Sequence, residues 1–362
     1  MRDPLGDYRS KRDAARTPEP VPRAPKPPRR QTGDRFVIQQ HHARRLHWDF
    51  RLERDGVLVS WAIPRGIPLD PDRNHLAVHT EDHPLEYADF SGEIPAGEYG
   101  AGTVRIFDRG TYTTEKWRDD EVMVVLRGER VSGRYVLFRT RGDDWMIHRM
   151  DPPPDGWQPM PDLLRPMLAS SGQLPHGADW GYEMWWNGLR AIGYVSGGRL
   201  VLRDHRDADV TARYPELRDL AEHLAPTECV LDGEIVGMDA TGRLDPEAVR
   251  VREQVPESRL RGLVQRRPVV YLVYDLMYAD GERTTSLPYQ ERRRRLDALG
   301  IAGERWQVPP YFPGDADATV AASREQGLPG VVAKRLESRY HPGERSKEWV
   351  TARNRGRTRR AP

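Results

Sequence analysis

A disulfide framework and a cluster of metal-bound thiolates are both excluded, because the 362 residues include a single cysteine, Cys229. This scarcity of thiols also fits a reducing compartment. Lysine is nearly as rare, since five of the 57 basic residues are lysine and the rest are arginine. A metal site must therefore use histidine and carboxylate ligands. Because arginine is far more frequent than lysine, we expect the planar guanidinium of arginine to make most phosphate contacts.

Long apolar runs are also lacking. No stretch approaches the ~20 apolar residues of a membrane span, and the charged, proline-rich N-terminus does not have the pattern of a signal sequence. We therefore expect a cytoplasmic protein without a membrane partner. The hydrophobic fraction of 37% and the mean hydropathy of -0.77 are low, but ten tryptophans and fourteen tyrosines suffice to build buried cores.

The distribution of proline, glycine and β-branched residues divides the chain into two domains, as its length allows. Short β-rich segments separated by glycine and proline predict a small barrel or sandwich in the first domain. Beyond a proline-rich break, strands alternate with helical stretches and predict an α+β domain. The predicted parts are a flexible basic and proline-rich arm (1–34), the β-rich domain (35–151), a proline-rich linker (152–163), the α+β domain (164–353) and a basic tail (354–362).

A cluster of histidines marks the candidate site of the first domain, since six of the eleven histidines fall between residues 41 and 83. Residues 46–52 alternate strictly, so a strand there turns four apolar side chains to one face and His47, Asp49 and Arg51 to the other. His47 and Asp49 can bind one metal ion with His41 as a third ligand, and this donor set suits Mn²⁺, Zn²⁺ or Fe²⁺. Arg51 can bind a phosphate oxygen. The alternative is a solvated polar strand face without a site.

Four ordered segments of the first 150 residues resemble the 3′-phosphoesterase domain of the bacterial ligase D family. They are QQHHARRLHWDFRLE (39–53), SWAIP (60–64), EDHPL (81–85) and IPAGEYGAG (94–102). Tyr8 and residues 11–13 and 17–20 also resemble the leading arm of that family, which is associated with end resection. The resemblance implies a small β-barrel phosphoesterase. It would remove a terminal nucleoside from a DNA 3′ end, leaving a 3′-phosphate, and would then remove that phosphate.

The resemblance also implies roles for individual residues. The implied metal ligands are His41, His47 and Asp49. Mn²⁺ is the expected ion, with Zn²⁺ or another divalent metal as the alternative. Arg51 and His83 would contact the scissile phosphate with help from Tyr87, and these three are the expected catalytic residues. The implied reaction is metal-assisted hydrolysis without a covalent enzyme intermediate.

Four further residues are implied to contact the substrate. Three belong to the arm, namely Arg12, Asp13 and Glu19. The fourth is His75, which stands where the family usually has a phosphate-binding arginine. A histidine there is shorter than arginine and only partly charged near neutral pH, so the sequence leaves open whether both hydrolysis steps take place.

Residues 164–353 resemble the adenylation domain of ATP-dependent DNA ligases, which implies an α+β nucleotidyltransferase fold. The resemblance rests on RPMLA (165–169), LDGEIV (231–236), YDLMYADG (274–281) and GVVAKR (330–335). A ligase attacks ATP with the lysine of a Lys-x-Asp-Gly-x-Arg motif, where this chain has WWNGLR (185–190). Trp185 occupies the nucleophile position, and an indole has no nucleophilic lone pair. We therefore expect no lysine-AMP intermediate and no ligation.

The second domain thus carries an expected degenerate ligase site, made of Trp185, Asn187, Arg190, Glu234 and Lys334. No lysine lies between Lys116 and Lys334 to replace the missing nucleophile. Glu234 and Lys334 are retained, and the sequence does not decide between ATP binding and a structural role for them. The residues given end where a ligase would begin its C-terminal OB domain, so no OB domain is expected.

Three functions follow as hypotheses. The favoured one is a DNA 3′-end-processing phosphoesterase of bacterial non-homologous end joining, because the metal and phosphate residues are intact. The alternatives are a non-catalytic DNA-binding or repair-complex adaptor, and an ATP-dependent DNA ligase, which Trp185 disfavours. The expected partners are DNA with 3′-phosphate or ribonucleotide ends, a Ku-type end-binding protein and a separate ligase or polymerase, which would place the protein at the nucleoid.

Overall fold

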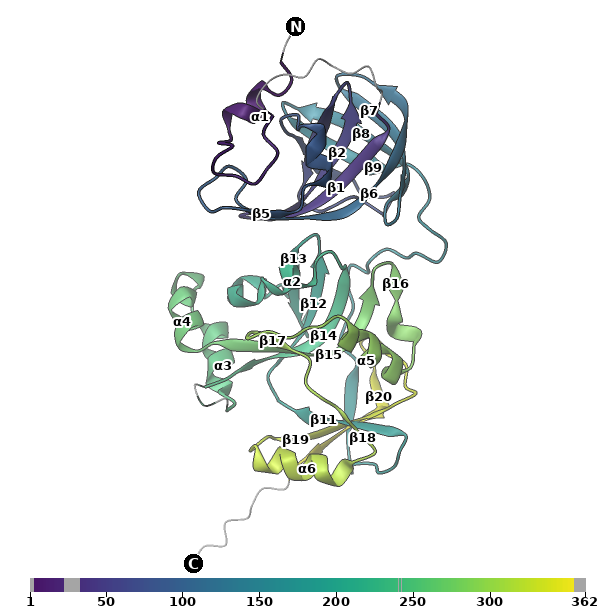
Figure 1. Ribbon diagram of the computed structural model, residues 1–362. Helices are drawn as coiled ribbons and strands as arrows, with labels where there is room; N and C mark the ends of the chain where they lie inside the picture. Colours follow the sequence, from purple (N-terminus) through teal and green to yellow (C-terminus); the bar gives the residue numbers. More distant parts are fainter. Residues whose placement is uncertain (1–2, 23–32, 240, 242, 355–362) are drawn as a thin grey trace, which may run out of the picture. The chain divides into compact units, whose positions relative to one another are not determined.

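A computed structural model describes residues 3–22, 33–239, 241 and 243–354 (Figure 1). It forms two compact units, Met1–Asp155 and Gly156–Pro362. The division falls inside the linker predicted for residues 152–163. Apart from Asn354, the predicted basic tail lies outside the described residues, as do residues 23–32 of the proline-rich arm.

Eight antiparallel strands of the first unit close into a barrel, which confirms the small β-barrel. Neighbours run from β1 through β2, β3, β4, β9, β8 and β7 to β6, and β1 also pairs with β6. A short ninth strand, β5, pairs with the beginning of β6. The strands are β1 (Arg35–His42), β2 (Leu46–Arg54), β3 (Val57–Ile63), β4 (His75–His79), β5 (Gly92–Ile94), β6 (Gly102–Trp117), β7 (Glu121–Gly128), β8 (Ser132–Arg141) and β9 (Asp144–Arg149).

Strand β2 separates the barrel interior from the candidate site. Phe50 faces inward, and its ring centroid lies 6.3 Å from those of Phe36 and of Trp61. The alternate side chains, including Asp49 and Arg51, lie on the outer wall, which is the face predicted to carry the chemistry. Both are nevertheless buried. The outer wall is therefore covered at this point.

The cover consists of the 3₁₀ helix η1 (Leu85–Asp89) and the N-terminal segment, which includes α1 (Gly6–Ser10). Tyr8 of α1 is fully buried and packs with Val37 of β1 and Tyr87 of η1. Its hydroxyl donates to the Pro20 carbonyl at 3.1 Å. The prediction of a flexible arm is thus wrong for residues 3–22, because the apolar surface of Tyr8 is buried against the barrel wall.

The second unit contains two sheets flanked by helices, which confirms the α+β fold. One sheet has the order β10-β20-β19-β11-β18, and the other has the order β13-β12-β14-β15-β16, with β17 also paired to β15. The strands are β10 (Leu168–Ser171), β11 (Trp180–Trp185), β12 (Leu189–Ser196), β13 (Arg199–Asp204), β14 (Cys229–Gly237), β15 (Val269–Ala279), β16 (Glu282–Arg283), β17 (Trp306–Gln307), β18 (Phe312–Pro313), β19 (Gly330–Arg335) and β20 (Arg345–Arg353).

The helices of the second unit pack on these sheets, α5 on β15, α3 on β14 and α6 on β11 and β19. The α-helices are α2 (Leu220–Leu224), α3 (Pro246–Gln254), α4 (Leu260–Arg266), α5 (Tyr289–Ala298) and α6 (Ala316–Glu325), and the 3₁₀ helices are η2 (Thr211–Arg213), η3 (Pro215–Leu217), η4 (Glu257–Arg259) and η5 (Thr284–Ser286).

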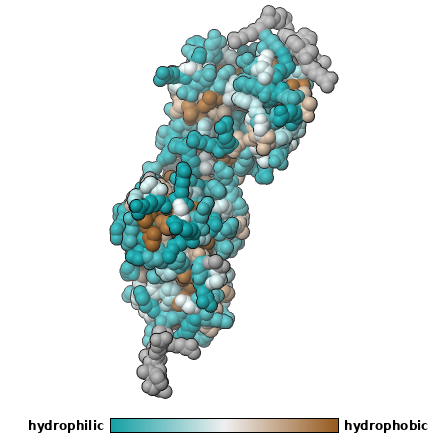
Figure 2. Space-filling view, turned by 90° about the vertical axis from the view of Figure 1, so that its left-hand side faces the viewer, coloured by the Kyte–Doolittle hydropathy of each residue, from teal (hydrophilic) through white to brown (hydrophobic). Residues whose placement is uncertain are grey.

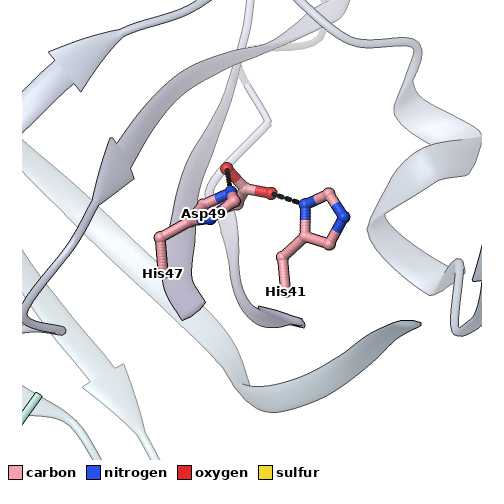
Figure 3. A group of neighbouring side chains, drawn as sticks. All are labelled: His41, His47 and Asp49. Carbon is pink, nitrogen blue, oxygen red and sulfur yellow. Dashed lines mark ion pairs between the residues drawn. The ribbon is translucent and has the colours of Figure 1, made fainter. Parts of the chain in front are cut away.

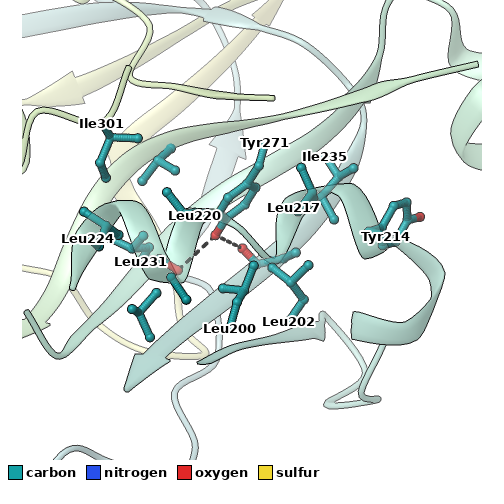
Figure 4. Packing of buried hydrophobic residues seen from close by; sticks show 14 of the residues in the cluster. Leu200, Leu202, Tyr214, Leu217, Leu220, Leu224, Leu231, Ile235, Tyr271 and Ile301 are labelled. Atoms are coloured by element: carbon teal, nitrogen blue, oxygen red, sulfur yellow. Dashed lines mark hydrogen bonds between the residues drawn. The ribbon is translucent and has the colours of Figure 1, made fainter. Parts of the chain in front are cut away.

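Tyr271 lies at the centre of the main core of this unit (Figure 4). Its hydroxyl donates to the carbonyl oxygens of Ala191 and Leu231, at 2.9 and 3.2 Å, so the phenol is buried without losing its hydrogen bonds. The ring lies against Gly233, where a Cβ would come within 2.6 Å of it. Glycine at this position therefore allows the ring to enter the core.

Figure 2 shows one face of the molecule that is mostly hydrophilic, with apolar colour in small separate patches. Within the described ranges, no α-helix combines the length and the apolar character that crossing a bilayer requires.

The carboxylate of Asp108 is expected to stabilise the barrel. It accepts hydrogen bonds from four backbone N–H groups, those of Arg109, Glu129, Arg130 and Val131, at 2.7 to 3.1 Å. Asp108→Ala leaves these donors without a partner and should lower the free energy of unfolding by about 2–4 kcal/mol. Urea unfolding followed by tryptophan fluorescence measures it. The control is Asp89→Ala, whose side chain is 71% exposed, and equal effects of the two substitutions would contradict the assignment.

Candidate active site

Three side chains that can bind a metal meet on the outer wall of the barrel (Figure 3). His41 comes from β1 and pairs directly with His47 of β2, and Asp49 lies two residues further along β2 on the same face. Their candidate ligand atoms all lie within 4.8 Å of one another. The Asp49 carboxylate stands between the rings, 3.6 Å from His41 Nδ1 and 3.6 Å from His47 Nε2.

Two backbone carbonyls fix the orientation of the imidazole rings. His41 Nε2 lies 2.8 Å from the Gly100 carbonyl oxygen, and His47 Nδ1 lies 3.0 Å from that of Arg45. Because a carbonyl only accepts, these nitrogens carry the protons of the neutral rings, and His41 Nδ1 and His47 Nε2 are left as lone-pair donors that face Asp49. Two imidazole nitrogens and a carboxylate held in this way fit a divalent ion such as Mn²⁺ or Zn²⁺.

Asp49 is buried and yet charged. Burial by itself raises the pKa of this carboxyl group, but the pKa lies well below its usual range, and the charge of the neighbouring Arg51 guanidinium is the largest cause of the lowering. Arg51 Nη2 donates to Asp49 Oδ2 at 3.0 Å. The carboxylate is therefore present in the deprotonated form that metal binding requires.

Arg51 connects the three candidate metal ligands to the residues that cover the outer wall. Its Nε donates to Gln39 Oε1 at 2.8 Å, and its Nη1 lies 3.0 Å from His83 Nδ1. The guanidinium carbon also lies 4.8 Å from the centre of the Tyr87 ring. The buried Arg51 guanidinium thus contacts the other two residues predicted to be catalytic, His83 and Tyr87.

His83 lies beneath the N-terminal segment, with its ring centroid 5.0 Å from that of Tyr8. Burial, followed by the charges of Arg51 and Arg12, holds its pKa well below the ordinary value, so the ring is neutral near pH 7. Nδ1 lies near Arg51 and 2.8 Å from the Glu81 carbonyl oxygen. Nε2 has no hydrogen-bond partner among the described residues, so it is the nitrogen available to a substrate.

The N-terminal arm contributes a buried ion pair to the site. Arg12 Nε donates to Glu19 Oε1 at 2.9 Å, and Arg12 Nη1 donates to Glu81 Oε1 at 3.1 Å. The Tyr87 hydroxyl donates to Glu19 Oε1 at 3.1 Å. The side chains of Arg12 and Glu19 are 5% and 0% exposed. Arg12 and Glu19 are therefore part of the wall of the site.

These side chains line one cleft of about 750 Å³, a size typical of sites for small molecules or for part of a polymer. It is lined by the predicted metal and catalytic residues His41, His47, Asp49, Arg51, His83 and Tyr87, and by Arg12 and Glu19. Arg44 and Arg45 of the β1–β2 turn also line it and are exposed. Within the described part of the chain neither arginine side chain has an acidic partner, so both can contact phosphate.

Two predicted substrate contacts, His75 and Asp13, do not line the cleft. His75 pairs with Ile147 on the interior side of the barrel, and its Nδ1 lies 2.7 Å from the Gly66 carbonyl oxygen. Asp13 is exposed, and its carboxylate accepts from the Ala15 N–H at 3.0 Å within a turn. The strand pleat and the turn direct these side chains away from the cleft, and their contact with the substrate stays a prediction.

Gln39 and Gly100 complete the site and were missed from the sequence. Gln39 is fully buried, and its amide nitrogen donates to the carbonyls of Tyr87 and Phe90 at 3.0 and 2.8 Å. It thereby attaches η1 to the strand that carries His41. The strand periodicity could have identified Gln39, because this residue lies two positions before His41 and therefore on the same strand face. Gly100 acts through its backbone, which leaves no signal in the side-chain pattern.

In the second unit, four of the five residues predicted for the degenerate ligase site line one pocket, and they are Trp185, Arg190, Glu234 and Lys334. This pocket has about 160 Å³, less than the ~300 Å³ at which sites for whole ligands begin. Asn187 does not line it. Asn187 has a positive φ of 57° and lines a neighbouring pocket of about 180 Å³ instead.

The charged groups of this pocket bind one another. Lys334 Nζ lies 2.8 Å from Glu183, and burial lowers the pKa of Lys334. Arg190 donates twice to Asp232, at 2.7 and 2.6 Å. The Arg353 guanidinium lies 4.9 Å from the centre of the Trp185 ring. An aromatic ring therefore occupies the nucleophile position, and Arg190 and Lys334 are each paired with a carboxylate.

Comparisons with known proteins match both units. The DNA Ligase D 3′-phosphoesterase domain matches residues 39–139, and the ATP dependent DNA ligase domain matches residues 166–352. The multifunctional non-homologous end joining protein LigD of Mycobacterium bovis is 48% identical over 355 residues, and that of Pseudomonas aeruginosa is 35% identical over 402 residues. These alignments cover 96% of this chain but 45% and 46% of the relatives. The chain thus spans less than half the length of these relatives.

Among solved structures, mycobacterial DNA ligase D complexed with ATP and MES shares 36% identity over 52% of this chain and 60% of its own, with a TM-score of 0.45.

We expect the chain, once freed of metal, to bind about one Mn²⁺ in a calorimetric titration. His41→Ala, His47→Ala and Asp49→Ala should each weaken binding at least tenfold, because each removes a ligand. Affinity should also fall as the pH is lowered, since protons compete for the imidazoles. The matched control is His42→Ala, which lies on the opposite face of β1 and should bind like wild type. Equal losses in His42→Ala and the other three variants would refute the site.

Proposed function

The chain belongs to the DNA ligase D family, and from this premise we propose that its first unit is a metal-dependent phosphoesterase that processes DNA 3′ ends in bacterial non-homologous end joining. The observation that carries the proposal is the meeting of His41, His47 and Asp49 in one cleft with Arg51 and His83. Such a cleft combines a metal-ligand set with a fixed cation and a neutral hydrogen-bonding ring, which together suit the stabilisation of a phosphoryl transition state.

The expected ion is Mn²⁺, with Zn²⁺ or another divalent metal as the alternative, because the two imidazole nitrogens and one carboxylate suit all of them. A bound ion would supply Lewis-acid polarisation of a non-bridging phosphate oxygen. The protein holds the three ligands in place beforehand, since Gly100 and Arg45 orient the rings and Arg51 keeps Asp49 charged.

The remaining residues of the cleft act on the phosphate. Arg51 offsets the negative charge that grows as water adds to phosphorus and the bond to the leaving oxygen breaks. In the tautomer whose Nδ1 accepts from Arg51, His83 donates a hydrogen bond through Nε2. Tyr87 is held by Glu19 beside the same guanidinium. Water supplies both the nucleophile and the proton for the leaving oxygen, so no covalent enzyme intermediate is required.

The proposed substrates are DNA 3′ ends that carry a ribonucleotide or a phosphate. A first hydrolysis releases the terminal nucleoside and leaves a 3′-phosphate, and a second releases inorganic phosphate and leaves a hydroxyl group. Arg44 and Arg45 at the cleft are free to contact the DNA backbone. Binding should therefore weaken as the salt concentration rises.

We further propose that the second unit does not ligate. Trp185 stands in place of the nucleophile, and the pocket around it is small and internally paired, so we assign no role to ATP. The unit then acts as a scaffold for DNA or for a partner such as a Ku-type protein or a separate ligase or polymerase. This activity belongs at the nucleoid, in the cytoplasm.

End processing is tested with a labelled primer-template whose primer ends in a ribonucleotide or a 3′-phosphate, incubated with Mn²⁺ or with EDTA. We expect Mn²⁺-dependent shortening and dephosphorylation by the wild type. His47→Ala and Asp49→Asn should lose at least a hundredfold in rate, because each removes a metal ligand, whereas His42→Ala should retain it. Absence of processing by the wild type would favour a non-catalytic adaptor.

Ligation is tested by incubating the chain with ATP labelled at the α-phosphate and by adding nicked DNA in a parallel reaction. We expect no radioactive protein on a denaturing gel and no sealed product, because Trp185 cannot form a phosphoramidate. An active ATP-dependent ligase serves as the positive control. A labelled band that resists denaturation, or sealing above background, would disprove this part of the proposal.

A further inference from the structure

The first unit has a second pocket, of about 270 Å³, at one end of the barrel. Aromatic rings form most of its wall, those of Trp61, Trp117, Trp145 and His79. Strand register places them on one face, because Trp61 pairs with His79, Trp117 with Val122 and Trp145 with Arg139. This is the interior face, so the pocket lies in the mouth of the barrel, where β-barrels commonly bind ligands.

The rings around this space pack on one another, mostly edge to face. The Trp61 ring centroid lies 5.7 Å from that of Trp145 and 6.5 Å from that of Trp117. His79 stacks on Trp145, with 6.1 Å between centroids and 30° between planes. Burial lowers the pKa of His79, so the histidine ring in the wall of the pocket is neutral. Trp117 is half-buried, and the Arg54 guanidinium lies 4.2 Å from the centre of its ring, so the part of the ring that Arg54 leaves uncovered is accessible to a ligand from solvent.

The polar groups of the pocket point to a ligand that both donates and accepts hydrogen bonds. Trp61 is 1% exposed, and its Nε1 has no hydrogen-bond partner among the described residues. A buried donor without a partner costs about 1–3 kcal/mol, which an acceptor on a ligand would recover. The rim carries Arg118, Arg139, Asp119 and Asp143. Two positive and two negative charges do not form an anion site, but they offer both donors and acceptors.

The pocket lies directly behind the cleft. Ala62 and Thr80 line the cleft, whereas their chain neighbours Trp61 and His79 line the pocket. Successive side chains of a strand point to opposite faces, so the two sites lie on opposite faces of β3 and β4. A single strand of DNA that passes around the end of the barrel would meet both.

We propose that this pocket binds one unpaired nucleobase of a DNA strand whose 3′ end lies in the cleft. A base is a flat, neutral heterocycle with donors and acceptors on its edge, which matches an aromatic wall that includes the half-buried Trp117, an indole N–H without a partner and a rim of mixed charge. The volume is below that of sites for whole ligands and suits a single ring system. The identification of this ring as a base of DNA rests on the proposed function, whereas the chemistry of the pocket does not.

The test compares a fluorescent single-stranded dT12 with an oligonucleotide of equal length that contains abasic residues, in EDTA to prevent cleavage. Fluorescence anisotropy with the full chain should show tighter binding of dT12. Trp117→Ala should weaken dT12 binding about tenfold, as expected for the loss of one stacked base, and should leave abasic binding unchanged. Trp117→Phe should retain most of the affinity. Phe107→Ala is the control, because Phe107 is a half-buried ring of the same barrel that lines neither site.

A second measurement does not depend on the folding of a variant. An oligonucleotide that carries 5-iododeoxyuridine, irradiated with the wild-type chain, should crosslink to Trp117 or Trp145, and mass spectrometry of the peptides locates the adduct. Equal binding of dT12 and the abasic strand, or adducts confined to other segments, would overturn the proposal. These outcomes are distinguishable from failure of the phosphoesterase, because Mn²⁺-dependent trimming by the wild type and by Trp117→Ala is measured separately.

Discussion

The buried guanidinium of Arg51 connects the parts of the candidate active site. It keeps Asp49 charged in a place where burial alone would favour the protonated acid, and it contacts Gln39, His83 and Tyr87. Burying a cation is unfavourable unless its donors are satisfied. The residues around Arg51 satisfy them, so that the metal ligands, η1 and the arm form one network rather than three neighbouring pieces.

This network can form on the outer wall of the barrel because η1 and the N-terminal segment cover the wall at this point. The outer wall of a barrel normally faces water, where charges are screened and metal-free carboxylates are solvated. Here Tyr8 and Tyr87 exclude water from one part of the wall, and Glu19 and Arg12 extend the paired charges into the arm. Electrostatic interactions are stronger in such a protected site than in water. The second unit differs, since Arg190 and Lys334 pair with Asp232 and Glu183 and the pocket beside Trp185 is small.

The sequence predicted those parts of the site that depend on local periodicity. Strict alternation over residues 46–52 placed His47, Asp49 and Arg51 on one face, because the pleat of a strand has a period of two. The closed barrel was predicted from the resemblance to a known family, whereas the residue pattern alone was equally compatible with a β-sandwich. The folded arm was missed because the burial of Tyr8 depends on η1, which lies almost 80 residues away. The role of His75 came from the resemblance to the family, and the strand pairing turns its side chain to the interior, which no pattern in the sequence indicated.

The central claim is that one divalent ion is held by His41, His47 and Asp49 on the outer wall of the barrel. The most direct measurement is an anomalous-scattering map from crystals of the chain grown or soaked with Mn²⁺. The account predicts one strong peak between His41 Nδ1, His47 Nε2 and the Asp49 carboxylate, with Arg51 still bound to Asp49. A peak at other residues, or an empty cluster in crystals that hold Mn²⁺ elsewhere, would contradict it.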